Sequence, residues 1–286
     1  MAEEREQRNQ VFSPPIGPGI PQVSIAEKVK ADFGYEIPTE TVPLPSNGLT
    51  YPTGSPLHGC ETVDIRAMTT REEDILTNQA LLKKGTVITE LIRSCLVNRA
   101  IEPLDMLTGD RTALTVAIRI TGYGAEYEAE VTCRECSAKW MQTFDLAALP
   151  IQRLEMAPLE PGTNAFEFTL PYTRKNVRFR FLTGRDEEEI TALAAKQKKL
   201  GLPSEASVTS NLLHSIVSID GIDDRAKIGA FVRNMPARDS RALREHVRDH
   251  EPGIAMRQEV TCQSCDHTEE VTIPFGTSFL WPTAGK

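Results

Sequence analysis

Alternating apolar and charged positions predict short β-strands in two parts of the chain. Apolar side chains alternate with charged ones at residues 63–67 and again, 114 positions later, at residues 177–181. A period of two is typical of a half-buried strand, because successive side chains point to opposite faces of a sheet. Each strand is therefore expected to place one face against a core.

Helical patterns follow the first of these strands. Thr70 and Glu73 form a capping-box pattern, which predicts a helix directly after Thr70. A second helix is expected over residues 87–97 and a third from about Asp110, where apolar residues recur at helical spacing. Residues 126–146 then predict a strand, a tight turn with two cysteines, and a returning strand.

The second half of the chain repeats this order of elements. Three segments match at offsets that only grow along the chain, as insertions in loops would produce. They are residues 182–188 with 68–74, 212–216 with 91–95, and 239–243 with 110–114, at offsets of 114, 121 and 129. We therefore predict an internally duplicated α+β fold, with a first repeat at residues 39–150 and a second at residues 151–286.

The first 38 residues show neither pattern. Prolines at positions 14, 15, 18 and 21 alternate with glycines, which excludes a regular helix or a central strand. A short amphipathic piece over residues 25–33 has helical spacing. Composition favours an extended or disordered arm over residues 1–38, and the alternative is an arm that lies on the surface of a neighbouring protein.

A Glu-Val-Thr-Cys-x-x-Cys motif closes each predicted repeat. It ends in Cys133 and Cys136, and again, 129 positions later, in Cys262 and Cys265. A Cys-x-x-Cys turn places two thiolates on one side, so two such turns facing each other complete a tetrahedral four-sulfur site suited to zinc. The prediction is one structural, zinc-ribbon-like site per chain, shared by both repeats. A disulfide, an iron–sulfur cluster and idle thiols are the alternatives.

Other chemistry-bearing residues have simpler structural interpretations. Cys95 lies in an apolar run and is expected in a helix core. His246 and His250 have the spacing of a metal-binding pair on a helix, but their charged neighbours favour a solvated polar face. Acidic runs at residues 72–74 and 186–189 fit first helical turns, where the helix dipole stabilises negative charge.

Composition argues against several classes of protein. The chain has 286 residues, of which 40% are hydrophobic and 25% charged, as in an ordinary globular protein. Its net charge of −8 and pI near 5.3 disfavour binding to nucleic acid or anionic membranes. No apolar run approaches the roughly 20 residues of a membrane helix. Six cysteines without a signal-peptide pattern suit a reducing cytoplasm.

The common catalytic motifs are also missing from the sequence. It contains no phosphate-binding loop, no Gly-x-Ser-x-Gly elbow and no His-Glu-x-x-His pattern. We therefore expect a protein that is not an enzyme.

An aromatic tail follows the second cysteine turn. Residues 273–282 contain Phe275, Phe279 and Trp281. Large rings either complete a protein's own core or anchor in a partner's pocket, where they contribute much of the binding energy. The sequence leaves both roles open for this tail.

Several motifs together resemble one protein family. They are Leu44-Pro45-Ser46-x-Gly48-x-x-Tyr51-Pro52, Met68-Thr69-x-x-Glu72-Glu73-Asp74-Ile75-Leu76-Thr77-Asn78, Lys84-Gly85-Thr86-Val87, Gly122-Tyr123-Gly124, both cysteine turns, Leu182-Thr183-Gly184 and the closing Phe-x-Trp-Pro. Over roughly residues 40–285 this pattern is similar to the T4-like baseplate proteins of contractile-tailed bacteriophages, whose founding member is a baseplate hub assembly component. The arm before residue 40 does not belong to the pattern.

The resemblance implies a non-enzymatic part of a phage tail. Such a protein would be made in the host cytoplasm, enter the virion, and contact hub, tail-tube or tape-measure proteins, without binding nucleic acid or inserting into a membrane. A transient assembly chaperone for hub or tape-measure proteins is the alternative hypothesis. A zinc-ribbon adaptor for nucleic acid is a third, which the acidic charge disfavours.

Overall fold

The computed structural model describes residues 33–200, 207–275 and 277–280. The chain divides into two units, residues 1–38 and residues 39–286. In the first unit, residues 35–38 form no regular element, and the side chains of Phe33 and Tyr35 are exposed. Residues 1–32, which make up most of the predicted arm, lie outside the described residues.

The second unit begins with a two-stranded antiparallel sheet. β1 (Thr39–Pro43) pairs with β2 (Thr62–Arg66), and one face of β2 is buried, which confirms the predicted alternation. The loop between the strands contains a tight turn at Asn47 and Gly48. Their φ angles of 50° and 69° are left-handed, a conformation that asparagine and glycine tolerate.

The helices that follow β2 lie where the sequence predicts them. α3 (Thr70–Thr77), α5 (Val87–Cys95) and α6 (Thr108–Tyr123) match the three expected helices, and a short unpredicted helix, α4 (Gln79–Lys84), precedes α5. Cys95 is fully buried, as expected for a residue in a helix core.

The capping box that starts α3 is one residue earlier than predicted. Thr69 and Glu72 form it, rather than Thr70 and Glu73, and the Thr69 hydroxyl donates to the Glu72 carboxylate at 2.7 Å. Glu72 takes this position because its buried carboxylate also accepts a hydrogen bond from Arg66. Sequence spacing alone does not choose between two adjacent glutamates.

The second half contains similar elements in the same order. β6 (Phe166–Thr169) and β7 (Asn176–Phe179) form an antiparallel pair, which β8 (Ile216–Ile219) extends. Within the described residues, four helices follow, as in the first half: α7 (Gly184–Lys199), α8 (Ser207–Ser215), α9 (Arg225–Arg233) and α10 (Ala237–His250). α7, α8 and α10 carry the segments that match α3, α5 and α6, whereas α4 and α9 have no matching segment. The chain is therefore of the α+β class, as predicted.

A buried capping cluster occurs at corresponding positions in the two halves. In each, a threonine N–H and hydroxyl donate to a carboxylate in the first turn of a helix, and an arginine from the preceding strand region pairs with that carboxylate. The clusters, 114 positions apart, are Arg66, Thr69 and Glu72 at α3 and Arg180, Thr183 and Asp186 at α7. The same three-residue arrangement thus starts the first long helix of each half.

A buried aspartate also starts the last long helix of each half. Asp110 in α6 and Asp239 in α10 are both fully buried and lie 129 positions apart. Asp110 accepts the N–H of Ser46 at 3.0 Å, and Asp239 accepts the N–H groups of Tyr172 and Thr173 at 2.8 and 3.0 Å. In both halves, the loop after the first strand is therefore fixed to the start of the last long helix.

The two halves meet where the chain enters α6 and α7. The N–H of Thr108 donates to the carbonyl of Leu182, and the N–H of Gly184 donates to the carbonyl of Met106, both at 3.0 Å. Apolar side chains of both halves form one continuous core. No helix within the described residues is long and apolar enough to cross a membrane.

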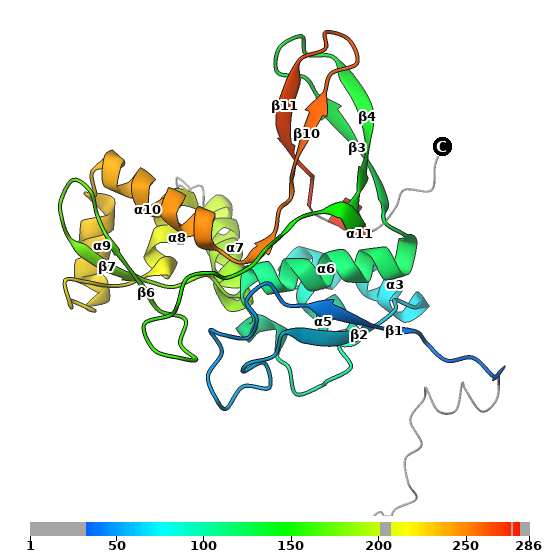
Figure 1. Cartoon of the computed structure of the whole chain (residues 1–286), viewed down its shortest axis with the longest axis horizontal. Coiled ribbons are helices and arrows are strands. Elements are labelled where there is room, and N and C mark those ends of the chain that lie inside the picture. Colours follow the sequence, from blue (N-terminus) through cyan, green and yellow to red (C-terminus); the bar gives the residue numbers. More distant parts are fainter. Residues whose placement is uncertain (1–32, 201–206, 276, 281–286) are drawn as a thin grey trace, which may run out of the picture. The chain divides into compact units, whose positions relative to one another are not determined.

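Each half ends in a β-hairpin. β3 (Glu126–Thr132) pairs with β4 (Lys139–Asp145), and β10 (Arg257–Thr261) pairs with β11 (Thr268–Thr272). The two hairpins project side by side from the helical layer (Figure 1). At their base, the two-residue strands β5 (Ile151–Gln152) and β9 (Gly253–Ile254) pair with each other, and a short helix, α11 (Thr277–Leu280), packs near the first hairpin.

Candidate metal centre

The two cysteine turns have the same backbone geometry. In the first, the N–H of Cys133 donates to the carbonyl of Ala138 at 2.9 Å, and the N–H of Ser137 donates to the carbonyl of Cys133 at 3.0 Å. In the second, Cys262 makes the equivalent bonds with His267 and Asp266, at 2.8 and 3.0 Å. Both turns therefore hold their two thiols in the same local arrangement.

A left-handed residue follows the second cysteine of each turn. Ser137 has a φ of 59° and Asp266 a φ of 57°. Residues other than glycine, asparagine and aspartate adopt this conformation rarely, and at some energetic cost. The same left-handed residue therefore completes the chain reversal in both turns.

The four thiols form one cluster. Their sulfur atoms all lie within 4.8 Å of one another. The Sγ atoms of Cys133 and Cys265 are 3.8 Å apart, and those of Cys136 and Cys262 are 3.6 Å apart. A disulfide needs about 2.05 Å, whereas a tetrahedral site with Zn–S bonds of about 2.3 Å has sulfur atoms about 3.8 Å apart. The separations fit four ligands around one ion and do not fit disulfides.

The surroundings of the thiols favour metal binding. Cys133 and Cys262 are buried, and Cys136 and Cys265 are exposed, so each turn contributes one inner and one outer thiol. The N–H of Ser264 donates to the Sγ of Cys262 at 3.4 Å, and this hydrogen bond, together with those from the Cys265 N–H and neighbouring thiols, lowers the pKa of Cys262 to about 7. The neighbouring thiols raise the pKa of Cys265 to about 12, so in the absence of a metal the cluster shares its protons unevenly. Thiolates are the forms that bind zinc.

The hairpins are also joined by contacts away from the thiols. The N–H of Arg134 in the first turn donates to the Glu269 carboxylate of β11 at 2.9 Å. Val131 and Val260 are buried at corresponding positions of β3 and β10. The thiol cluster is therefore placed by packing and by a polar bond between hairpins, as well as by the two turns.

The histidine pair on α10 does not form a solvated face. The ring of His246 stacks on Phe168 with centroids 4.4 Å apart and meets the edge of Phe179 at 5.6 Å. Burial lowers the pKa of His246. The prediction of a solvated polar face is therefore wrong for His246, because the aromatic face that covers it comes from strands some 70 residues away in sequence.

The acidic runs hold structural positions, as predicted. Glu72 and Asp186 cap α3 and α7, and each is paired with an arginine. Glu188 accepts a hydrogen bond from the Thr89 hydroxyl at 2.5 Å, which joins α7 to α5. These carboxylates thus bind groups of the protein itself.

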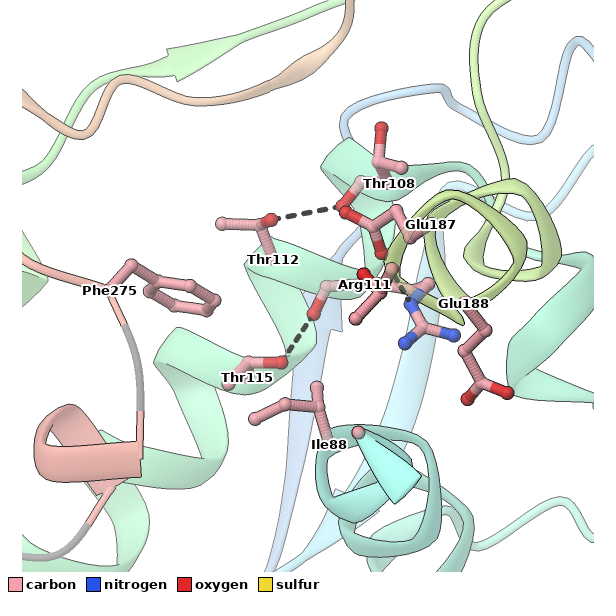
Figure 2. Close-up of a pocket in the computed structure, with 10 residues that line it drawn as sticks. Ile88, Thr108, Arg111, Thr112, Thr115, Glu187, Glu188 and Phe275 are labelled. Atoms are coloured by element: carbon pink, nitrogen blue, oxygen red, sulfur yellow. Dashed lines mark hydrogen bonds and ion pairs between the residues drawn. The ribbon is translucent and has the colours of Figure 1, made fainter. Parts of the chain in front are cut away.

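A buried arginine that the sequence analysis missed lies beside a small cleft between α6 and α7 (Figure 2). Arg111 is 5% exposed, and its Nε lies 3.5 Å from a carboxylate oxygen of Glu187. Burial lowers the pKa of Arg111 and raises that of Glu187. Thr112, Thr115 and the Phe275 ring also line the cleft. The ion pair joins the two halves. In the sequence, Arg111 has no signal of burial beyond its place in the segment 110–114, which matches residues 239–243.

Part of the aromatic tail completes the protein's own core. Phe279 and Leu280 are fully buried, and the Phe279 ring meets Tyr127 of β3 at 5.0 Å between centroids. Arg119 of α6 donates to the Phe279 carbonyl at 3.0 Å. Trp281 lies outside the described residues. Phe279 therefore packs in the protein's own core, which is one of the two roles that the sequence left open for the tail.

Comparison with known proteins gives one match. A family model described as T4 bacteriophage base plate protein matches residues 38–281. No curated protein and no solved structure matches the chain.

Proposed function

This chain belongs to the T4 bacteriophage base plate protein family, and from that premise we propose that it is a non-enzymatic structural component of the hub or inner part of a contractile-tail baseplate. The family match carries the proposal, because it spans residues 38–281 and so includes both halves and both cysteine turns. Membership in this family supports a structural role in a phage baseplate and a place in the virion tail.

The arrangement of polar groups supports a structural part rather than an enzyme. The buried carboxylates Glu72, Asp110, Asp186 and Asp239 each accept hydrogen bonds from the protein's own backbone or side chains. A general acid or base needs a free lone pair or proton directed at a substrate. These four carboxylates are directed inward, where they hold loops and helices together.

The composition of purified virions tests the proposed role. A structural component should be present at a fixed number of copies per tail, measured by quantitative mass spectrometry against a tail-tube protein. Its absence from finished particles, together with its presence in assembly intermediates, would instead support the alternative of a transient chaperone. Partners in the intermediates, whether hub, tail-tube or tape-measure proteins, can be identified by cross-linking in the infected host cytoplasm.

The cysteine cluster is proposed to hold one structural zinc ion per chain. Four thiols at tetrahedral separations leave no open coordination position, which suits a structural rather than a catalytic site. A metal there would join two hairpins that are far apart in sequence, and thiolate-bound zinc contributes on the order of 10 kcal/mol in small zinc-binding peptides.

Elemental analysis of the purified protein tests the metal. About one zinc per chain is expected, with no absorption in the visible range. Iron with visible absorption would indicate an iron–sulfur cluster, and two zinc ions per chain would contradict a shared site. Cys136→Ser should abolish stoichiometric binding, whereas Cys60→Ser, at a half-buried cysteine outside the cluster, should leave it unchanged.

The two halves are proposed to be copies of one ancestral unit. The repeated element order, the two capping clusters, the two buried aspartates and the two matching cysteine turns support this. Each feature alone is a common local motif. Their occurrence at increasing offsets along one chain favours duplication, since chance would not preserve the order.

A further inference from the structure

The two halves contact each other through non-equivalent surfaces, the entry to α6 and the start of α7. The equivalent surface of the other half takes no part in this contact in either case. The entry to α6 belongs to the first half, and the start of α7 belongs to the second half. If the halves are copies, the second half has its own version of the α6 entry, at α10, and the first half has its own version of the α7 start, at α3. The contact is thus heterologous, since it joins two different surface patches. A heterologous contact leaves one patch of each kind free to bind a further copy.

We propose that a second copy of this chain binds head to tail, with the start of its α3 against the start of α10. The two regions lie at opposite ends of the 39–286 unit (Figure 1), so they cannot meet within one chain. The proposal rests on the proposed relation between the halves, and it names one partner within the proposed baseplate role.

The backbone groups needed for this contact are present at both faces. In the contact between the halves, an N–H at the first residue of α6 and another at the first residue of α7 each donate to a carbonyl across the junction. The corresponding residues are Ala237, the first of α10, and Thr70, the first of α3. N–H groups in a first helical turn have no acceptor within their helix. The matching acceptors are the carbonyls of Met68 and Met235.

The side chains at the two faces are complementary in size. In the existing contact, the large Arg111 side chain packs on Gly184, where a Cβ atom would lie 1.9 Å from the guanidinium. At the two free surfaces, the smaller Ser240 occupies the position of the arginine, and the larger Thr70 occupies the position of the glycine. A smaller residue on one side is thus matched by a larger residue on the other.

The two free surfaces also carry a polar pair equivalent to one in the contact between the halves. Arg185 pairs with Asp105 at 2.6 Å in the existing contact, and their counterparts are Arg71 and Asn234. The amide nitrogen of Asn234 donates to a carbonyl of its own helix at 2.8 Å, and the amide oxygen remains an acceptor for the Arg71 guanidinium.

A hydroxyl–carboxylate pair in the contact between the halves also has equivalent residues at the free surfaces. Thr89 donates to Glu188 at 2.5 Å, and the corresponding residues are Ser210 and Asp74, again a hydroxyl and a carboxylate. Asp74 is exposed and, among the described residues, has no ion-pair partner. The exposed Arg238 at the start of α10 adds an opposite charge on the facing surface.

Cross-linking between two variants that each carry one introduced surface cysteine tests the proposal in the full chain. Thr70→Cys and Ala237→Cys are each introduced into a Cys60→Ser background, and a short bismaleimide is added to each protein alone and to an equal mixture. A head-to-tail contact predicts a cross-linked dimer mainly in the mixture, and a ladder of larger species when both changes are in one chain. Equal dimer in either variant alone, or no product above the Cys60→Ser parent, would overturn the proposal.

Sedimentation at a series of concentrations gives an independent measurement. Asp74→Lys should weaken self-association about threefold or more, as expected for loss of an exposed charged contact. Glu128→Lys makes the same charge change on an exposed position of β3 and should leave association unchanged. Equal effects of the two changes would contradict the proposed face. A chain that is present in virions but fails both tests would refute head-to-tail binding while the structural role stands.

Discussion

The carboxylate of Glu72 is fully buried and yet held in its charged form. Burial alone would raise its pKa, but hydrogen bonds from Arg66, Ser94 and Thr69 outweigh burial and lower the pKa to about 2. A carboxyl whose pKa is lower in the folded than in the unfolded protein stabilises the fold above its unfolded pKa. That contribution is lost as the pH falls toward the folded pKa.

The free energy of unfolding should therefore decrease between about pH 4.5 and pH 2, by on the order of 3 kcal/mol from this group. Glu72→Gln should remove this part of the pH dependence, because glutamine does not ionise. Urea unfolding at several pH values measures the effect. Glu61→Gln, at an exposed glutamate, serves as the control, and an unchanged pH slope in Glu72→Gln would contradict the prediction.

The two buried aspartates should differ in their contribution to stability. Asp110→Ala leaves the Ser46 N–H, the Ser46 hydroxyl and the Tyr51 hydroxyl without their acceptor, inside the core. We expect a loss of about 2–4 kcal/mol. Asp239→Ala should cost about 1–2 kcal/mol, since its bonds with the N–H groups of Tyr172 and Thr173 are only part-buried and water can replace the lost acceptor. Urea unfolding of both variants tests this order, and a larger loss for Asp239→Ala would contradict it.

Among the elements of the fold, the cysteine turn combines a repeated sequence with a strained backbone. Ser137 and Asp266 hold the same left-handed position in the two turns. Aspartate tolerates this conformation better than serine does, because its side chain bonds to nearby backbone groups. The first turn is therefore the more strained of the two.

Substitution at residue 137 should reveal this strain. Ser137→Gly is expected to keep or raise the melting temperature, since glycine adopts a positive φ without steric cost. Ser137→Val should lower stability by about 1–2 kcal/mol, because a β-branched side chain is unfavourable there. Thermal unfolding with zinc present measures both. The same pair of changes at Thr132, at the end of β3, is the control and should show the reverse preference.

At the scale of the whole molecule, the cysteine cluster is where the two halves depend on each other. If one ion is shared, then losing a ligand from either turn should disrupt the same site. Cys133→Ser and Cys262→Ser should each lower the melting temperature by a similar amount, and the double variant should lose less than the sum. Calorimetry provides the measurement. Additive losses would mean that the two turns stabilise the protein independently.

The local elements could be predicted from the sequence because their signals are local. The alternation in β2, the apolar spacing in α5 and α6, and the flanks of both hairpins each lie within a short window. The structure corrected the capping residue of α3 and the surroundings of His246. Glu72 is selected by its contact with Arg66 of the preceding strand, and His246 is covered by rings from distant strands. Neither contact follows from the apolar spacing of the helix itself.

By itself, the sequence determined the four candidate ligands and the elements that carry them. A Cys-x-x-Cys turn between two strand patterns specifies a pair of thiols, whatever the rest of the chain does. Only the tertiary structure decided that the two pairs converge, with all four sulfur atoms within 4.8 Å of one another across hairpins separated by more than 100 residues. It also decided that Arg111 is buried at the junction of the halves. Spacing along the chain sets local geometry, whereas convergence depends on how two packed halves share one core.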